Sequence, residues 1–295
     1  MHIFLGFILG GLSVGSIYAL LALGFVLIYK SSSIFNFAQG ELLLLGAYLV
    51  FFFLAQLRIP LPIALLISVA IGMGIGFAIE RVALRPLIGQ PVLSTIMMTL
   101  GLAVFIRGFV QVLWSGSWRT YPAIFPSSVL SLGKINISVQ FIFCFFIAVI
   151  FVGILMLFFR YSKEGLAMRA VAESHSSSQA CGVNVSFVLA LSWGIAMSVS
   201  VIGGFLLGSI MGLSPPILAG MGLKVFPVVL FGGLESLGGA IIGGLVMGIL
   251  ENLAIGYIDP LVGGGIADVF VYFIMLIILI FKPYGLFGLT RIERI

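Results

Sequence analysis

The side chains most often used in catalysis and metal binding are scarce in this sequence. Its only histidines are His2 and His175, and its only cysteines are Cys144 and Cys181. Two histidines so far apart leave no imidazole cluster for a metal ion or a proton relay. One cysteine falls in an apolar run and the other in a polar loop, a usage that indicates neither a disulfide framework nor a metal site. We therefore expect no metal ion and no catalytic residue in this chain.

A polar cluster of Asn36, Gln39 and Glu41, with Gly40 among them, begins an apolar segment that extends to Gln56. Asn36 is suited to cap a helix while Gln39 reaches back to it, and the helix dipole favours Glu41 in the first turns. On that interpretation the cluster only starts a membrane helix. The alternative is a helix start at membrane depth whose free N–H groups and polar side chains line a translocation path, as in transporters. The residues leave both interpretations open.

The sequence contains no phosphate-binding loop of the pattern G-x-x-x-x-G-K-[ST]. Any ATP must therefore be bound by a partner, and we expect no cofactor on this chain. The net charge of +5 does not indicate a nucleic-acid partner, because the basic residues are dispersed among the loops rather than gathered on one face.

Long uncharged apolar runs must position these few polar residues. The chain has only 14 Lys and Arg and 9 Asp and Glu residues among 295, and 62% of it is hydrophobic. A hydrocarbon core about 30 Å thick is crossed by roughly 20 helical residues. Four runs of that length carry no charge at all: 3–29, 61–79, 135–159 and 186–223. This composition excludes a soluble enzyme and predicts an all-α, polytopic integral membrane helix bundle in the lipid bilayer.

We predict about eight or nine transmembrane or re-entrant segments from these runs. The candidate crossings are 3–29, 35–56, 61–80, 92–114, 138–159, 187–211, 217–234, 237–257 and 265–281. Two of them are marginal, because the second starts with the polar cluster and the seventh carries Lys224 and Pro227. Either of these two is a full crossing or a broken or re-entrant segment surrounded by protein.

Basic residues predict the orientation of the crossings. The positive-inside rule favours an external N-terminus and a cytoplasmic C-terminus. The cytoplasmic loops then hold Lys30, Arg81, Arg85, Arg160, Lys163 and Arg169, the external loops hold Arg58, Arg119 and Lys134, and the cytoplasmic tail holds Lys282, Arg291 and Arg294. We expect the first span to stay uncleaved, because the N-terminus has no basic region and no early cleavage site.

Pairs of glycines four residues apart let helix backbones approach closely. They are Gly6 with Gly10, Gly11 with Gly15, Gly72 with Gly76, Gly204 with Gly208, Gly239 with Gly243 and Gly244 with Gly248. They indicate tight packing within one bundle or, alternatively, a dimerisation face. We see no repeat of fixed period and no low-complexity linker, so we expect one membrane domain over 1–295.

The longest polar stretch, 160–184, separates two apolar spans on the predicted cytoplasmic side. Segment 164–180 has no proline, is rich in helix formers, and is followed by Gly182 in the position of a helix-ending glycine. A short helix parallel to the membrane and a solvated connecting loop are both compatible with these residues.

Four segments in this order resemble the branched-chain amino acid permeases of ABC importers, the LivH-type family. They are Asn36-Phe37-Ala38-Gln39-Gly40-Glu41; Gly165-Leu166-Ala167-Met168-Arg169-Ala170-Val171-Ala172 followed by Gly182-Val183-Asn184; Lys224-Val225-Phe226 with the glycines that follow it; and Lys282-Pro283-Tyr284-Gly285-Leu286-Phe287-Gly288. Gln39 stands where the family commonly has histidine.

The resemblance implies that the polar loop 160–186 is a coupling segment that docks on a separate ATPase. The residues it assigns to coupling are Glu164, Gly165, Met168, Arg169, Ala170, Ala172 and Gly182, and a possible translocation path is formed by Asn36, Gln39, Gly40 and Glu41. It also implies a second, non-identical permease chain, two ATP-binding subunits that carry the ATP, an extracytoplasmic substrate-binding protein, and a location in the bacterial inner membrane. The expected function is therefore a permease subunit for branched-chain or related small amino acids or amides.

The rival interpretation is a self-sufficient, ion-coupled secondary transporter or channel. Such a protein needs intramembrane acids or histidines of its own. We place only Glu41, and Asp268 near the start of the last span, in that category. For Arg107, which lies within an apolar span, the two interpretations are snorkelling toward the membrane surface and substrate binding, and we expect snorkelling. We expect Glu235 and Glu251 to mark the interface ends of the glycine-rich helix.

Overall fold

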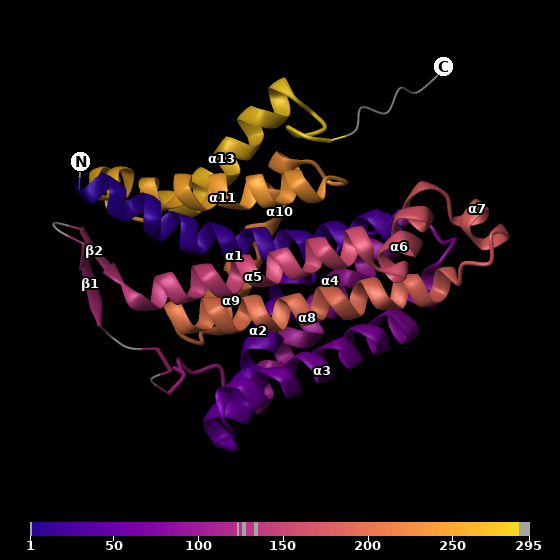
Figure 1. Ribbon diagram of the computed structural model, residues 1–295, viewed down its shortest axis with the longest axis horizontal. Coiled ribbons are helices and arrows are strands. Elements are labelled where there is room, and N and C mark those ends of the chain that lie inside the picture. The colour runs from indigo at the N-terminus through magenta and orange to yellow at the C-terminus, as the bar shows by residue number, and fades with distance from the viewer. Residues whose placement is uncertain (1, 123, 126–127, 133–134, 289–295) are drawn as a thin grey trace. The chain divides into compact units, whose positions relative to one another are not determined.

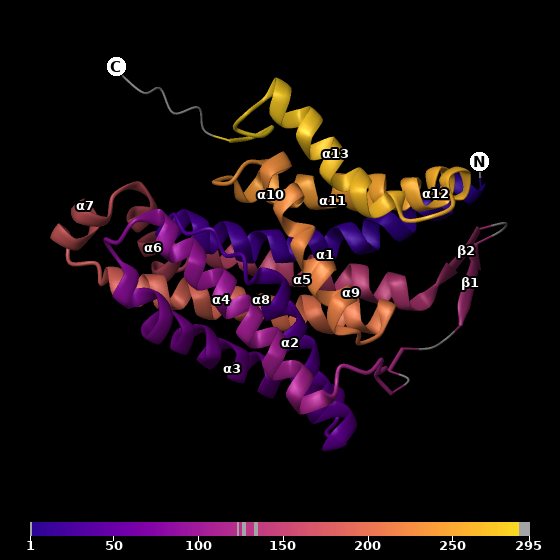
Figure 2. The same cartoon turned by 180° about the vertical axis from the view of Figure 1, so that it is seen from behind.

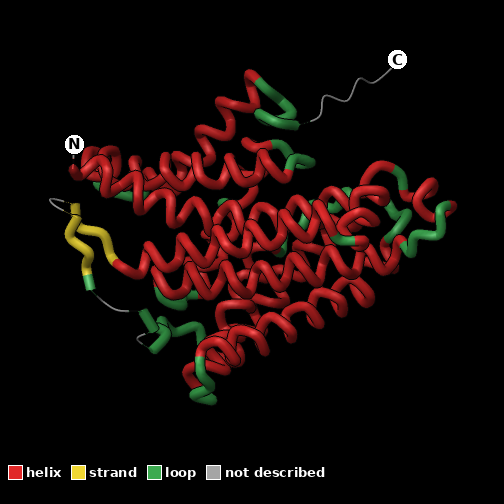
Figure 3. The backbone as a smooth tube through the Cα atoms, in the orientation of Figure 1, coloured by secondary structure: helices red, strands yellow, loops and turns green. Residues whose placement is uncertain are grey.

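The computed structural model describes residues 2–122, 124–125, 128–132 and 135–288. Lys134, Arg291 and Arg294, which entered the predicted orientation, lie outside the described residues. Helices make up most of the described chain, and one short hairpin supplies its strands (Figure 3). Eight helical stretches of the described part are long and apolar enough to cross a membrane, and α13 (Ile266–Phe281) is a shorter apolar helix. The predicted polytopic helix bundle is confirmed.

The elements follow one another in this order. They are α1 (His2–Ser32), α2 (Gln39–Phe51) with a π-helical turn (Phe52–Gln56), α3 (Leu61–Ile79) with a π-helical turn (Glu80–Leu84) and a 3₁₀ turn (Arg85–Leu87), α4 (Val92–Trp114), β1 (Val129–Leu132), β2 (Ile135–Ser138), α5 (Val139–Tyr161), α6 (Lys163–Glu173), α7 (His175–Ala180), α8 (Val185–Met211), α9 (Pro215–Leu223), α10 (Val225–Gly232), α11 (Leu237–Leu253) with a π-helical turn (Ala254–Ile258), α12 (Asp259–Val262) and α13. β1 and β2 pair antiparallel, with Val129 opposite Ser138.

Segment 217–234 is a broken helix, one of the forms that the sequence left open, and proline chemistry explains the break. Pro227 has no N–H to donate to the carbonyl of Leu223, and its ring would collide with that carbonyl in a continuous helix. The chain therefore ends α9 at Leu223 and starts α10 at Val225, with Lys224 at the break. The break places the charged side chain of Lys224 inside a membrane segment.

The described residues form two compact units. One unit contains Leu27–Ile124 and Ile150–Leu223. Within it α8 packs along α3 on one side and along α2 on the other, and α2 also packs on α4 and α9 (Figures 1 and 2). Glycine allows these contacts to be close, because a Cβ added at Gly46 of α2 would lie 2.5 Å from the Cα of Val201 in α8.

The other unit contains Met1–Val26, Phe125–Val149 and Lys224–Ile295. In it α1 and α11 meet through glycines of the predicted pairs. A Cβ at Gly11 would lie 2.6 Å from the Cα of Ile249, and one at Gly15 would lie 2.8 Å from the carbonyl oxygen of Gly244. These glycines pack helices within the chain, as one of the two interpretations predicted. Gly6 is different, since a Cβ there would meet nothing within 4 Å.

Candidate functional site: charges and polar groups within the membrane spans

The polar cluster at the start of α2 is an internal hydrogen-bonded network. The amide of Asn36 donates to Oε1 of Gln39 at 3.0 Å, and the amide of Gln39 donates to the hydroxyl of Ser200 in α8 at 3.1 Å. Ser200 in turn donates to the carbonyl of Ala196 at 2.8 Å. Asn36, Gln39 and Ser200 are all buried. The network therefore fixes α2 to α8 through side chains whose polar groups have partners.

The predicted capping role of Asn36 is wrong in its details. Oδ1 of Asn36 accepts from the N–H of Ala38 at 3.1 Å, and α2 begins one residue later, at Gln39. The side chain of Asn36 is thus used in the turn before the helix, a common role for asparagine. Gln39 bonds the side chain of Asn36 rather than its backbone N–H.

Gly40 packs against α9. A Cβ added at Gly40 would lie 2.5 Å from the carbonyl oxygen of Ala219, and Gly222 lies against Gly40 from the other helix. Two glycines facing each other let the backbones of α2 and α9 approach more closely than any side chain permits. In this structure the helix start is therefore closed by protein at Gly40.

Glu41 is the residue of the polar cluster that pairs with a partly exposed side chain of this unit. Its carboxylate forms an ion pair with Arg107 of α4, through Oε1 and the guanidinium. The Glu41 side chain is 3% exposed and that of Arg107 is 46% exposed. The second carboxylate oxygen, Oε2, is buried and has no hydrogen-bond partner. The pairing of the Arg107 guanidinium with a buried acid was not predicted from the sequence.

An apolar groove of about 620 Å³ lies between α2, α3 and α4. Its lining begins at Leu45, one helical turn after Glu41, and continues along α2 to Gln56. On α4 the lining residues Ile106 and Phe105 directly precede Arg107. An ion pair and an apolar groove thus occupy neighbouring turns of the same two helices.

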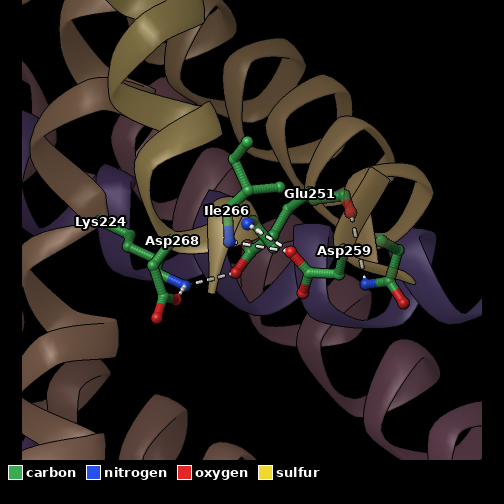
Figure 4. A network of polar contacts seen from close by, with 8 residues as sticks. Lys224, Glu251, Asp259, Ile266 and Asp268 are labelled. Carbon is green, nitrogen blue, oxygen red and sulfur yellow. Dashed lines mark hydrogen bonds and ion pairs between the residues drawn. The ribbon is translucent and has the colours of Figure 1, made fainter. Parts of the chain in front are cut away.

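A second charged cluster joins α10, α11 and α13 in the other unit (Figure 4). The ammonium of Lys224, at the helix break, donates to Glu251 of α11 and to Oδ1 of Asp268 of α13, the latter at 2.7 Å. Nearby, the carboxylate of Asp259 accepts from the N–H groups of Ile266 at 2.8 Å and Ala267 at 3.0 Å. Asp259 thereby supplies acceptors for free N–H groups at the start of α13.

The predicted role of Glu251 is wrong. This side chain is 3% exposed and paired with Lys224, so it lies inside the unit rather than at an interface end. Glu80, at the end of α3, is a further buried acid that sequence reasoning missed, and Arg85 pairs with it at 2.8 Å. The sequence feature that could have predicted both buried acids is a single charge in an otherwise apolar span, since such charges are normally paired inside the protein.

The predicted coupling segment is helical, but it forms two helices rather than one. Ser174 has an extended backbone, and its hydroxyl accepts from the N–H of Ser177, so it ends α6 and caps α7. Gly182 adopts a φ of +84°, which confirms the expected helix-ending glycine. The segment therefore lies as a bent helical pair at one end of α8 (Figure 1).

The residues expected to act in coupling divide by burial into three groups. Gly165 and Met168 are buried, and a Cβ at Gly165 would lie 2.7 Å from the carbonyl oxygen of Phe158, so these two hold α6 against its own unit. Glu164 and Arg169 are exposed, and Ala170 and Ala172 are partly buried. Sequence reasoning missed the most prominent apolar residue of this surface, Leu166, which is exposed.

This chain is similar to known proteins over nearly its whole length. The family model for the branched-chain amino acid transport system / permease component matches residues 7–280. The high-affinity branched-chain amino acid transport system permease protein BraD of Pseudomonas aeruginosa is 29% identical over 301 residues, which cover 98% of this chain and 97% of BraD. The corresponding protein LivH of Escherichia coli K12 is also 29% identical, over 99% of this chain and 98% of LivH.

Among solved structures, PsaBC from Streptococcus pneumoniae in complex with Fab superposes with a TM-score of 0.51. The identity is 14%, and the match covers 97% of this chain and 94% of that chain. At this identity the likeness concerns the fold alone. The family model, in contrast, spans nearly the whole sequence. This chain therefore belongs to the family of branched-chain amino acid transport system permease components, and it is a multi-pass membrane transport protein rather than an enzyme.

Proposed function

We propose that this chain is the permease subunit of an ATP-driven importer for branched-chain or related small amino acids or amides, with 1–295 acting as one transmembrane domain. The observation that carries this proposal is the match, over nearly its full length, to permease proteins named for branched-chain amino acid transport. An ion-coupled secondary transporter is not favoured, because these relatives are components of transport systems rather than self-sufficient carriers.

The proposed importer contains a second, non-identical permease, two ATP-binding subunits and an extracytoplasmic substrate-binding protein. ATP is bound by the partners, consistent with the missing phosphate-binding loop. The membrane is the bacterial inner membrane, and the C-terminus lies in the cytoplasm. The basic residues Arg160, Lys163 and Arg169 support this orientation, since they lie at one end of the bundle with α6 and α7.

The surface proposed to meet the ATPase is the exposed face of α6, defined by Leu166, Arg169 and Glu173. Buried Gly165 and Met168 hold the helix from the opposite side, so the exposed face is presented on a fixed support. An exposed leucine flanked by charges of both signs is a typical arrangement for a small protein interface with an apolar centre and a polar rim. Movement of the ATPase would reach the spans through the junction of α6 with α8.

The experiment compares two changes in α6 in the assembled importer. Ala170→Trp adds bulk beside the docking face, and Leu166→Ser removes its apolar centre. Each variant is expected to weaken the association with the ATPase by about 10-fold or more, since central apolar interface residues typically contribute that much. Transport and ATPase stimulation should fall together, while membrane insertion stays normal.

Leu261→Ser is the matched control, because Leu261 in α12 is 83% exposed and lies far from α6 in the sequence. It should leave the association with the ATPase unchanged. Normal association and uptake in both α6 variants would show that 160–186 is only a connector. Saturable ATP binding by the isolated chain would contradict the assignment of ATP to partner subunits.

A further inference from the structure

We infer that Glu41 and Arg107 bind the charged head group of an α-amino acid, and that the apolar groove beside them receives its aliphatic side chain. This inference rests on the proposed function, because it names the substrate contacts within the permease. It concerns one unit of the chain, in which α2 carries Glu41 and α4 carries Arg107.

The first observation is the unused oxygen of Glu41. Arg107 occupies Oε1, whereas Oε2 is buried without a hydrogen-bond partner. Buried polar atoms in native proteins nearly always have partners, so an unpaired carboxylate oxygen at membrane depth requires an explanation. A substrate ammonium supplies three N–H donors and a positive charge, which are the groups that this oxygen lacks.

The second observation is the unequal burial of the two partners. Glu41 is held within the protein, whereas Arg107 is 46% exposed at the end of a long side chain. Arg107 is therefore able to move away from Glu41 and uncover it. Its guanidinium carries five N–H donors and matches a carboxylate in geometry, so after moving it can bind the carboxylate of the substrate.

Charge balance restricts the ligand to a zwitterion. Separating Glu41 from Arg107 leaves two uncompensated charges within a membrane span, which is costly. An α-amino acid inserted between them replaces one ion pair with two and leaves the net charge unchanged. An amine satisfies only Glu41, and a carboxylic acid satisfies only Arg107, so both should bind more weakly.

The apolar groove is the proposed binding site for the aliphatic side chain of the amino acid. Neither charged side chain lines it, but lining residues lie within one helical turn of each along the chain, and its volume of about 620 Å³ exceeds the size of any aliphatic amino-acid side chain. Leu45, Phe105 and Phe109 are among its mainly apolar lining residues. A polar side chain placed there would lose hydrogen bonds to water without replacing them, so the site should favour aliphatic over polar amino acids.

The test measures direct ligand binding to the two permease chains with their ATP-binding subunits in nanodiscs of phosphatidylcholine, after ATP-driven leucine uptake by the complete wild-type importer has been recorded in proteoliposomes. The ligands are L-leucine, 3-methylbutylamine, which lacks the carboxylate, and 4-methylpentanoate, which lacks the ammonium. The experiment uses the permease complex without its external binding protein. The two incomplete ligands should bind about 30-fold more weakly or worse, as expected when one partner of a buried charge pair is missing.

The variants Glu41→Gln and Arg107→Gln should each weaken leucine binding by a similar factor. Glu80→Gln is the matched control, since it changes another buried, arginine-paired acid of the same unit and should leave leucine affinity unchanged. A second readout is the alkylation of a cysteine introduced at Phe109, which leucine should slow in the wild-type background and not in Glu41→Gln. This readout does not depend on transport.

The outcomes separate the two proposals. Absence of ATP-driven leucine uptake by the wild type would refute the proposed function. Normal uptake by the wild type together with unchanged leucine affinity in Glu41→Gln would refute the present inference alone. Alkylation at position 109 that leucine does not slow, but anionic phospholipid does, would identify the groove as a lipid site and also overturn the inference.

Discussion

Lys224, at a helix break, forms ion pairs with two acidic residues. Replacing Lys224 by methionine tests whether this charge cluster stabilises the protein. Methionine keeps much of the side-chain length and apolar stem but removes the ammonium. The side chains of Lys224 and Glu251 are 5% and 3% exposed, so both charges are removed from lipid and water. Lys224→Met therefore leaves Glu251 as an uncompensated buried charge.

The expected magnitude follows from this burial. Removing one partner of a buried ion pair destabilises proteins by about 3–5 kcal/mol, so we expect a loss of that size for Lys224→Met. Asp268 contributes much less, because its side chain is 74% exposed even though it lies 2.7 Å from Lys224. For an exposed partner the contribution is about 1 kcal/mol or less, which is the loss expected for Asp268→Asn.

The assay is reversible SDS unfolding in mixed micelles, applied to Lys224→Met, Glu251→Gln and the double variant. Once Lys224 is gone, neutralising Glu251 removes the unpaired charge, so the double variant should be more stable than Lys224→Met alone. The coupling energy should be about 2 kcal/mol or more, in the upper part of the range for residues in contact. Additive losses, or a Lys224→Met protein as stable as the wild type, would refute the buried ion pair.

Three further outcomes are expected. Gly40→Val should destabilise the chain by about 1–3 kcal/mol in the same SDS unfolding assay, because a Cβ there would lie 2.5 Å from a carbonyl oxygen of α9. Gly101→Val is the control and should destabilise the chain less, because a Cβ at Gly101 would meet nothing within 4 Å. Ser177→Cys and Ser117→Cys should react with an impermeant thiol reagent from opposite sides of the membrane; labelling of both from one side would contradict the orientation. Gly182→Ala should cost about 1 kcal/mol in thermal unfolding, since its φ of +84° disfavours a side chain, and an unchanged midpoint would argue against that strain.

The opposite placement of these two serines follows from the geometry of α8. Its 27 residues span about 40 Å at 1.5 Å per residue. The N–H of Arg119 donates to the carbonyl of Leu213 at 3.0 Å, just beyond the C-terminal end of α8, whereas α7 lies at the N-terminal end. Residues 117 and 177 are therefore near opposite ends of one long helix.

The spans were predictable from the sequence because length and composition alone decide whether a helix can cross a lipid bilayer. The break at Lys224 was also predictable, since Pro227 prevents a continuous helix by local chemistry. The division of the coupling segment at Ser174 was harder to predict. The division occurs because the hydroxyl of Ser174 accepts a hydrogen bond from a backbone N–H. Such a local hydrogen bond and a continuous helix differ by only a small free energy.

The charged pairs were not predictable, because their partners are distant in the sequence. Glu41 and Arg107 are 66 residues apart, and Lys224 and Glu251 are 27 apart. The sequence shows that each charge lies in or near a span, but not which helix faces are in contact. That information comes from the packing of α2 on α4 and of α10 on α11, the second of which includes close glycine contacts.

Substrate uptake by proteoliposomes of defined composition tests directly whether this chain is a permease subunit of an ATP-driven importer. Vesicles with this chain alone are compared with vesicles that also contain the second permease, the ATP-binding subunits and the substrate-binding protein, each with and without ATP and with and without a sodium or proton gradient. Leucine uptake is expected only for the complete set with ATP, independent of either gradient. Gradient-driven uptake by the chain alone would contradict this expectation.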